Sequence, residues 1–190
     1  ASVNFADNTI DASGGRLELA GTRSLDSITT NANTTLQINS SGSISRTDSG
    51  INTVGDLLLS PAEGSSSASL DVSDMSLEVA GTAPQFNDAD FTLSSANLVF
   101  QNSPTFENGS SVDVSSGELI FQSGATISDS SLDFTSSSFK PSGTVSLTGS
   151  SVFMFDSDSS VVLEGDTTIS DDDDDRIPSQ MGSFSWPSLD

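Results

Sequence analysis

Short pairs of apolar residues recur along the chain at a nearly constant interval. The two members of a pair stand at positions i and i+2, as Leu119 and Phe121 do, and serine, glycine, asparagine and aspartate fill the gaps. One such pair begins at Leu17, Leu36, Leu57, Leu77, Leu98, Leu119, Phe139 and Val161, with intervals of 19 to 22 residues. The i, i+2 spacing predicts strands with one buried face, because helical i, i+3, i+4 spacing is nowhere sustained.

Two further apolar positions accompany each repeat. One precedes the pair at Ile10, Thr30, Ile51, Leu70, Phe91, Val112, Leu132 and Val152, and another follows it at Leu25, Ile44, Phe86, Phe106, Ile127, Leu147 and Ile169. Three short strands and three corners per repeat predict an all-β chain, a single parallel β-solenoid with about eight coils of about 20 residues. Successive apolar positions are about seven residues apart and their spacing varies, which favours a right-handed β-helix. The third repeat lacks its last position, so we expect a loop or distorted corner at residues 60–67.

The central prediction is that equivalent residues of successive repeats stack on one another. Leu77, Leu98 and Leu119 should then form one interior column. An antiparallel β-sandwich also uses short strands and turn-rich connections, but it would not keep one position in phase through eight repeats.

The repeat predicts three segments along the chain. Residues 1–170 form the solenoid, residues 171–176 an acidic linker, and residues 177–190 an apolar C-terminal tail. The apolar residues of the tail are Ile177, Met181, Phe184, Trp186 and Leu189. We expect the tail either to cap the last coil or to dock as an arm on a neighbouring subunit.

The negative charge of the chain limits the classes of partner that it is expected to bind. The 27 acidic and 5 basic residues give a formal net charge of −22, with Lys140 as the single lysine. Nucleic acids and anionic membrane surfaces need cationic partners, so neither is expected to bind. The acidic surface suits a saline or calcium-containing medium, although plain solubility explains it equally well. No apolar run approaches the ~18 residues of a membrane helix, so membrane insertion is not expected.

Cysteine and histidine are both absent. Their absence excludes disulfides, thiolate zinc sites and imidazole catalysis. Acidic pairs that could act on polysaccharides are plentiful by composition alone, so they do not single out a catalytic site. We therefore expect a protein that is not an enzyme. Three patterns for N-glycosylation stand at Asn33, Asn39 and Asn108, and chance supplies such patterns in a chain rich in serine and threonine.

The first candidate site is an acidic column. The residues expected to point outward beside the leading apolar position are Asp11, Asn31, Asn52, Asp71, Thr92, Asp113, Asp133 and Phe153. Stacking would place Asp113 next to Asp133, where like charges repel. Bound calcium would relieve this repulsion because it prefers oxygen ligands. The alternative is that both carboxylates splay into water and that no cofactor binds.

A second candidate is a set of apolar residues at outward or terminal positions. The middle residue of the main pair should face solvent, yet it is apolar at Leu58, Val99, Ile120 and Val162. Exposed apolar surface often marks an interface. At the other end, Val3 and Phe5 already fit a strand, so we expect an uncapped N-terminal coil whose edge recruits other strands.

The segment "SSVDVSSGELIFQSGATISDSSLDF" resembles the repeats of right-handed β-helical surface proteins, namely autotransporter passenger domains and adhesins of the filamentous-haemagglutinin type. The resemblance covers about residues 9 to 170. It implies export together with adhesion or scaffolding, and it transfers no functional residue.

The expected function follows from the open ends, the tail and the apolar outward positions. We predict a structural subunit of an extracellular or cell-surface fibre, sheath or layer that self-associates into a homopolymer. The alternative is a β-helical adhesin or receptor-binding rod, with carbohydrate contact as one form of binding. A polysaccharide-acting enzyme fits less well.

Overall fold

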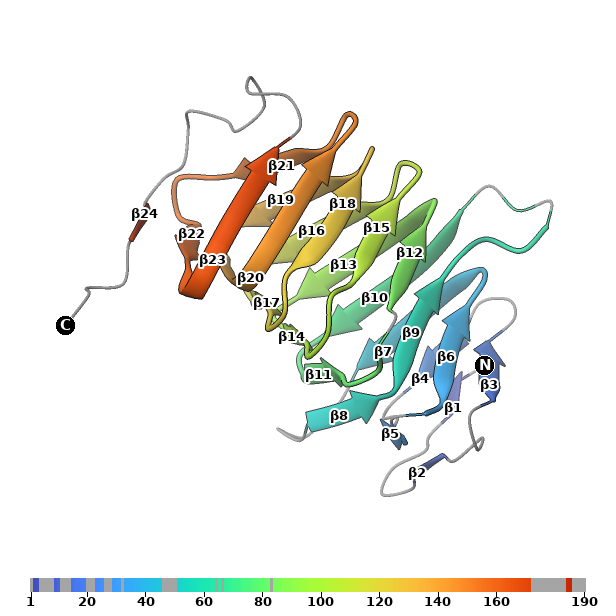
Figure 1. Cartoon of the computed structure of the whole chain (residues 1–190). Helices are drawn as coiled ribbons and strands as arrows, with labels where there is room; N and C mark the ends of the chain where they lie inside the picture. Colours follow the sequence, from blue (N-terminus) through green and yellow to red (C-terminus); the bar gives the residue numbers. More distant parts are fainter. Residues whose placement is uncertain are drawn as a thin grey trace.

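The computed structural model shows parallel strands that coil into a β-solenoid (Figure 1). It describes residues 2–3, 9–10, 15–19, 23–25, 29–31, 33–45, 51–63, 65, 67–82, 84–171 and 184–185. Throughout these ranges there is no helix, and every strand pair is parallel. The strands form three long faces, which we call face 1, face 2 and face 3.

Face 1 is a sheet of eight strands. In sheet order they are β1 (Ser2–Val3), β4 (Arg23–Leu25), β7 (Ser41–Ser45), β10 (Ala68–Ser73), β13 (Ala89–Ser94), β16 (Ser111–Ser115), β19 (Ser131–Thr135) and β21 (Val152–Phe155). Serine, threonine and aspartate alternate with apolar residues along the central strands, so one side of the sheet is buried and the other is solvated.

Faces 2 and 3 are joined into one sheet by the long strand β20 (Ser138–Thr148), which bends at Gly143 with φ +79°. Face 2 contains β8 (Ile51–Val54), β11 (Ser76–Val79), β14 (Asn97–Phe100), β17 (Glu118–Phe121), the first part of β20, β22 (Ser160–Val162) and β24 (Phe184–Ser185), and the short pair β2 (Thr9–Ile10) and β5 (Thr29–Thr30) precedes it. Face 3 contains β3 (Arg16–Leu19), β6 (Thr35–Ile38), β9 (Asp56–Leu59), β12 (Gln85–Asn87), β15 (Thr105–Glu107), β18 (Ala125–Ser128), the second part of β20 and β23 (Glu164–Asp171).

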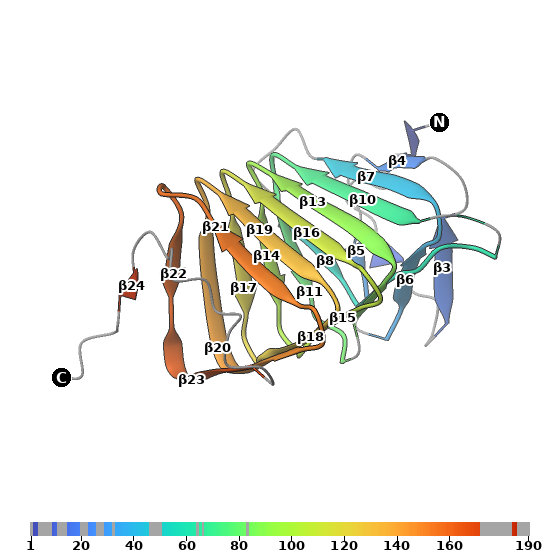
Figure 2. The ribbon, with the colours of Figure 1, turned by 90° about the horizontal axis from the view of Figure 1, so that it is seen from above.

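The chain visits face 1, face 2 and face 3 in turn, and the coil is right-handed as predicted. Six consecutive turns run from β7 to β23, and β1 to β6 precede them as short strands. The described turns are thus slightly fewer than the eight predicted coils. Figure 2 shows the turns stacked side by side, with β3 at one end of the rod and β23 at the other.

The predicted interior column is confirmed. Leu77 pairs with Leu98 and Leu98 with Leu119, and all three side chains are fully buried on face 2. Aromatic rings fill much of the remaining interior; for example, Phe86 stacks on Phe106 with ring centroids 4.5 Å apart. Since one coil cannot bury its own apolar face, the stability of the rod depends on contacts between neighbouring turns.

The predicted phase across the third repeat is wrong. Leu57 was aligned with Leu77, but Leu57 belongs to face 3, and Leu77 pairs with Asn52 on face 2. The expected loop at residues 60–67 is present, because β9 ends at residue 59 and β10 begins at residue 68. This insertion is about as long as the spacing between neighbouring apolar positions. The intervals between apolar pairs therefore stay near 20 residues, although the pairs before the insertion lie on a different face from the pairs after it.

Left-handed backbone conformations mark two of the corners. The corner from face 1 to face 2 uses Asp74, Ser95, Ser116 and Ser136, and the corner from face 3 to face 1 uses Asp88, Asn108 and Asp129; each of these residues has φ between 49° and 57°. Aspartate and asparagine tolerate this region better than most residues. The corners stack as the strands do: the Ser95 amide donates to the Ser115 carbonyl oxygen at 2.9 Å.

Candidate functional site

A polar groove runs along the corner between face 1 and face 2. Its main hollow has a volume of about 570 Å³, and a second hollow of about 240 Å³ adjoins it at Asn97. The groups on its face 2 side are Asn97, Glu118, Ser138 and Ser160, which occupy one outward column on four successive turns. The exposed corner residues Ser116 and Ser136 line the same hollow. The groove therefore follows the axis of the rod.

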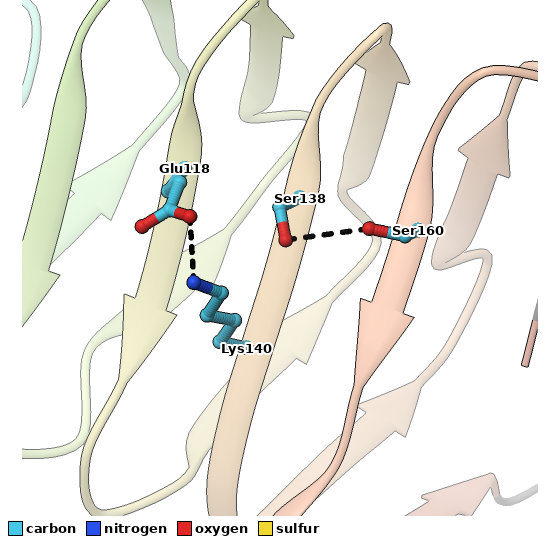
Figure 3. Close-up of polar contacts among 4 residues, drawn as sticks. All are labelled: Glu118, Ser138, Lys140 and Ser160. Carbon is cyan, nitrogen blue, oxygen red and sulfur yellow. Dashed lines mark hydrogen bonds and ion pairs between the residues drawn. The ribbon is translucent and has the colours of Figure 1, made fainter. Parts of the chain in front are cut away.

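An ion pair fixes one carboxylate of this groove. Lys140 Nζ donates to Glu118 Oε1 at 2.6 Å, with 27% and 35% of the two side chains exposed. Figure 3 shows Lys140 reaching from β20 to Glu118 on the neighbouring β17, with Ser138 and Ser160 on the turns that follow. The two serine hydroxyls lie 3.4 Å apart. Sequence reasoning missed this arrangement, because the two partners are 22 residues apart and the surrounding serines carry no signature.

A longer corner lines the groove at its last turn. Two residues separate Thr135 from Ser138, whereas three residues separate Asp156 from Ser160 one turn later, and Asp158 in this longer corner lines the hollow. The Asp156 carboxylate accepts hydrogen bonds from the Ser136 amide at 3.1 Å and the Ser159 hydroxyl at 2.6 Å. These hydrogen bonds hold the pKa of the Asp156 carboxyl below its usual value, and the bond from the Ser159 hydroxyl has the largest effect.

The predicted acidic column is only partly correct. Asp113 and Asp133 do pair on neighbouring strands of face 1. Partial burial, and then the charges of Asp133 and Asp90, raise the pKa of Asp113 above its usual value. Within the described ranges, no group of three or more acidic side chains comes together as a metal site would require.

Two residues of the predicted acidic column point into the interior instead of toward solvent. Asn52 and Phe153 were expected to face solvent, but both are buried. Asn52 lies on face 2 rather than face 1, and its Nδ2 donates to Met75 Sδ at 3.5 Å. Leu132 pairs with Phe153 and not with Val152, so the outward residue beyond Asp133 is Met154, which is 44% exposed.

The predicted apolar stripe is split between two faces. Val99 and Ile120 pair on face 2 and are half-buried, while the next residue of that column is Lys140. Val162 is also a half-buried outward residue of face 2. Leu58 is half-buried as well, but it lies on face 3 between Gln37 and Gln85, so its assignment to the same stripe is wrong.

The terminal residues predicted to form an interface fall mostly outside the described ranges. Val3 lies in β1, where its backbone pairs with Leu25. Phe184 lies in β24, where its backbone pairs with Val161 of β22. Phe5, Ile177, Met181, Trp186 and Leu189 lie outside the described residues. The two described residues of the tail therefore extend face 2 by one short strand beyond β22.

The two ends of the rod leave apolar core residues half-covered. Leu17 at the first end and Phe155 and Ile169 at the last end are only partly buried, although they pack against the core. An uncapped first end was predicted from the sequence, but these particular half-covered residues were not. Of the glycosylation patterns, Asn33 and Asn108 are exposed, whereas Asn39 is buried and donates to Glu18 Oε1 at 2.5 Å.

Comparison with known proteins found no matching family model, no matching curated protein and no matching solved structure. Among the residues that the structure describes, no helix has the length and apolar character needed to cross a membrane.

Proposed function

We propose that the chain is a structural subunit of an extracellular or cell-surface fibre, sheath or layer, and that its copies join head to tail into a homopolymer. One observation carries the proposal: Leu17 and Ile169 are the two ends of a single interior column on face 3. Pairing register connects Leu17 to Leu36 and Leu57 at one end, and Ala125 to Val145 and Ile169 at the other. On the two turns between them, the buried prolines Pro84 and Pro104 stand one residue before the paired residues Gln85 and Thr105 and so continue the column. The inner members are buried, whereas both ends are only partly buried.

A second copy would continue this column. If β3 of one copy paired with β23 of the next, Leu17 would lie beside Ile169 and Arg16 beside Thr168, in the register that the turns within one chain already use. Such pairing would satisfy backbone groups at the sheet edge and bury the half-covered core residues. Because the contact joins two different surfaces, it repeats without closing and produces a fibre.

The two ends differ in charge. Residues 1–47 hold three of the five basic residues, Arg16, Arg23 and Arg46, against four acidic residues, Asp7, Asp11, Glu18 and Asp26. The last turn carries exposed Glu164 and Asp166 on β23, and the acidic run 171–175 begins where β23 ends. Because the last end is the more acidic one, repulsion disfavours contact between two last ends and so favours the head-to-tail orientation.

Two end variants test the proposal. Leu17→Asp and Ile169→Asp each place a charge in the contact, where an unpaired charge costs about 3 kcal/mol or more, so each should weaken association at least about 100-fold. Thr168→Asp adds the same charge to the same strand at an exposed outward position and should weaken association far less. Sedimentation velocity and electron microscopy would measure the assembly, and circular dichroism would verify that each variant is folded.

Mixing the two variants gives the sharpest outcome. The Leu17→Asp chain keeps an intact last end and the Ile169→Asp chain keeps an intact first end, so an equimolar mixture should form dimers that grow no further. Mixtures that stay monomeric, or single variants that form fibres like the unmodified chain, would contradict head-to-tail assembly.

A monomeric adhesin or receptor-binding rod is the second candidate. The polar groove favours it, because a solvent-open hollow of about 570 Å³ offers a place for a ligand along the rod. An unmodified chain that remains a monodisperse rod at high concentration would support this function over the fibre.

We further propose that the role is not enzymatic and that calcium is not required. The two carboxyl groups whose pKa is shifted, that of Asp113 upward and that of Asp156 downward, lie on different parts of the surface and do not form a catalytic pair. Release of reducing sugar from a polysaccharide would contradict the first statement. Calcium bridging of Asp113 and Asp133 is the alternative to the second, and a melting temperature lowered by EGTA would support that bridging.

A further inference from the structure

The groove between face 1 and face 2 runs along the side of the rod from β14 to β22 of the last turn, on another side than the proposed β3–β23 contact on face 3, and head-to-tail assembly gives it no role. We infer that it binds a segment of a neutral, linear polysaccharide. This inference is independent of fibre formation, since it concerns a lateral surface of a single chain.

The shape of the groove selects an elongated ligand. The side chains of one column, Asn97, Glu118, Ser138 and Ser160, come from four successive turns. Neighbouring strands are about 4.8 Å apart, so these groups repeat along the rod axis at that interval. The longer corner that carries Asp158 bounds the hollow at its last turn. A chain molecule lying parallel to the axis would meet one polar group on each turn.

The charges of the groove select a neutral ligand. The single lysine of the sequence pairs with Glu118, so this carboxylate is neutralised within a protein of net charge −22. Asp158 stands exposed in the wall of the hollow. An acidic polysaccharide would be repelled by the field of the whole chain. A polyhydroxyl ligand carries no such penalty.

The chemistry of the lining matches sugar hydroxyls. Amide and hydroxyl groups both donate and accept hydrogen bonds, and a carboxylate held by lysine is a strong acceptor for an O–H donor. Val99 and Ile120 stand half-buried on face 2 beside Asn97 and Glu118, two positions further along β14 and β17. They do not line the hollow itself, but a pyranose ring that extends past Asn97 and Glu118 along these strands would meet their apolar side chains with its C–H face.

The test titrates the full chain with three neutral hexasaccharides, cellohexaose, laminarihexaose and N-acetylchitohexaose, and with hexagalacturonate as the acidic counterpart. Calorimetry or NMR line shifts would measure binding. We expect saturable binding of at least one neutral probe and weaker binding of hexagalacturonate.

Matched variants locate the site. Ser138→Ala removes a hydroxyl from the groove, and loss of one hydrogen bond should weaken binding about fivefold. Ser146→Ala is the control, because Ser146 lies on the same strand but on face 3, where its hydroxyl faces that of Ser170 at 3.2 Å much as Ser138 faces Ser160. Glu118→Gln should weaken binding about tenfold, since it removes the charged acceptor.

Each result decides the inference. Binding that falls with Ser138→Ala and Glu118→Gln but not with Ser146→Ala supports it. Absence of saturable binding for all three neutral probes, tighter binding of hexagalacturonate, or equal effects of the two serine variants would overturn it. Loss of fibre formation in the end variants bears on assembly alone, because those substitutions lie outside the groove.

Discussion

The middle of the rod and its two ends use the same sequence pattern with different results. In the middle, a residue such as Phe106 has a stacked neighbour on both sides and is almost completely buried. At the ends, Leu17 and Ile169 each pair with a neighbour on one side only among the described strands, and both are partly exposed. In a solenoid, burial is set by the presence of a next turn and not by the apolar character of the residue. The ends are therefore where a second copy adds the most stability.

The largest expected difference between these regions is in the free energy of unfolding. Phe106→Ala should destabilise the chain by about 3–5 kcal/mol, because it leaves a cavity between full neighbours. Ile169→Ala should cost about 1 kcal/mol or less, since its side chain is only partly removed from water. Urea denaturation of the monomeric protein would measure both. Equal losses would mean that the last turn is covered as completely as the middle.

A truncation of the tail tests how much β24 contributes to the stability of the last end and whether the tail takes part in assembly. Removing residues 176–190 deletes β24, whose backbone pairs with β22. The truncated chain should lose about 1 kcal/mol of stability and a few degrees of melting temperature, because its strand edge loses hydrogen-bonded partners. It should still assemble, since the face 3 column is intact. A truncated chain that is as stable as the parent but no longer assembles would show that the tail docks on a neighbour.

The smallest expected effects concern pH and distinguish two acidic residues. The pKa of Asp156 is lowered in the folded chain, so its stabilisation is present above the ordinary value of 3.8 and is lost as pH falls through the folded pKa. Asp156→Asn should therefore lower the melting temperature at neutral pH and have little effect near pH 2.

Asp113 behaves in the opposite way. Its pKa is raised, so its charged form is disfavoured in the folded chain, and the cost is relieved as pH falls through the raised pKa towards 3.8. Asp113→Asn should slightly raise the melting temperature at neutral pH, with no gain below about pH 3.8. Thermal melts at several pH values would measure both variants. A neutral-pH loss of stability in Asp113→Asn would contradict the assigned direction.

Some of this architecture was predictable from residue spacing, and the reasons are local. The i, i+2 pairs at Leu77, Leu98 and Leu119 define strands and a stacked column, because solenoid turns repeat their side chains at fixed positions. The slip after Leu57 was not predictable, because the 60–67 insertion mimics the spacing of one face. Spacing alone does not show which of three equivalent faces a strand joins.

The groove escaped prediction for a different reason. Its polar groups are serines, an asparagine and one ion pair, which are common residues without a diagnostic spacing. The hollow depends on how the corner residues of successive turns stack and on the extra residue in the corner at 157–159. The half-covered ends likewise depend on where the stack stops, and an individual leucine or isoleucine does not reveal that.

Cross-linking between copies tests head-to-tail continuation most directly, because the chain contains no cysteine of its own. A double variant, Arg16→Cys with Thr168→Cys, places one thiol on each end in the predicted register, and neighbouring strands lie within the distance that a disulfide spans. Under mild oxidation the account predicts a ladder of covalent oligomers on a non-reducing gel, while each single variant yields dimers at most. A double variant that gives only monomers and dimers would contradict it.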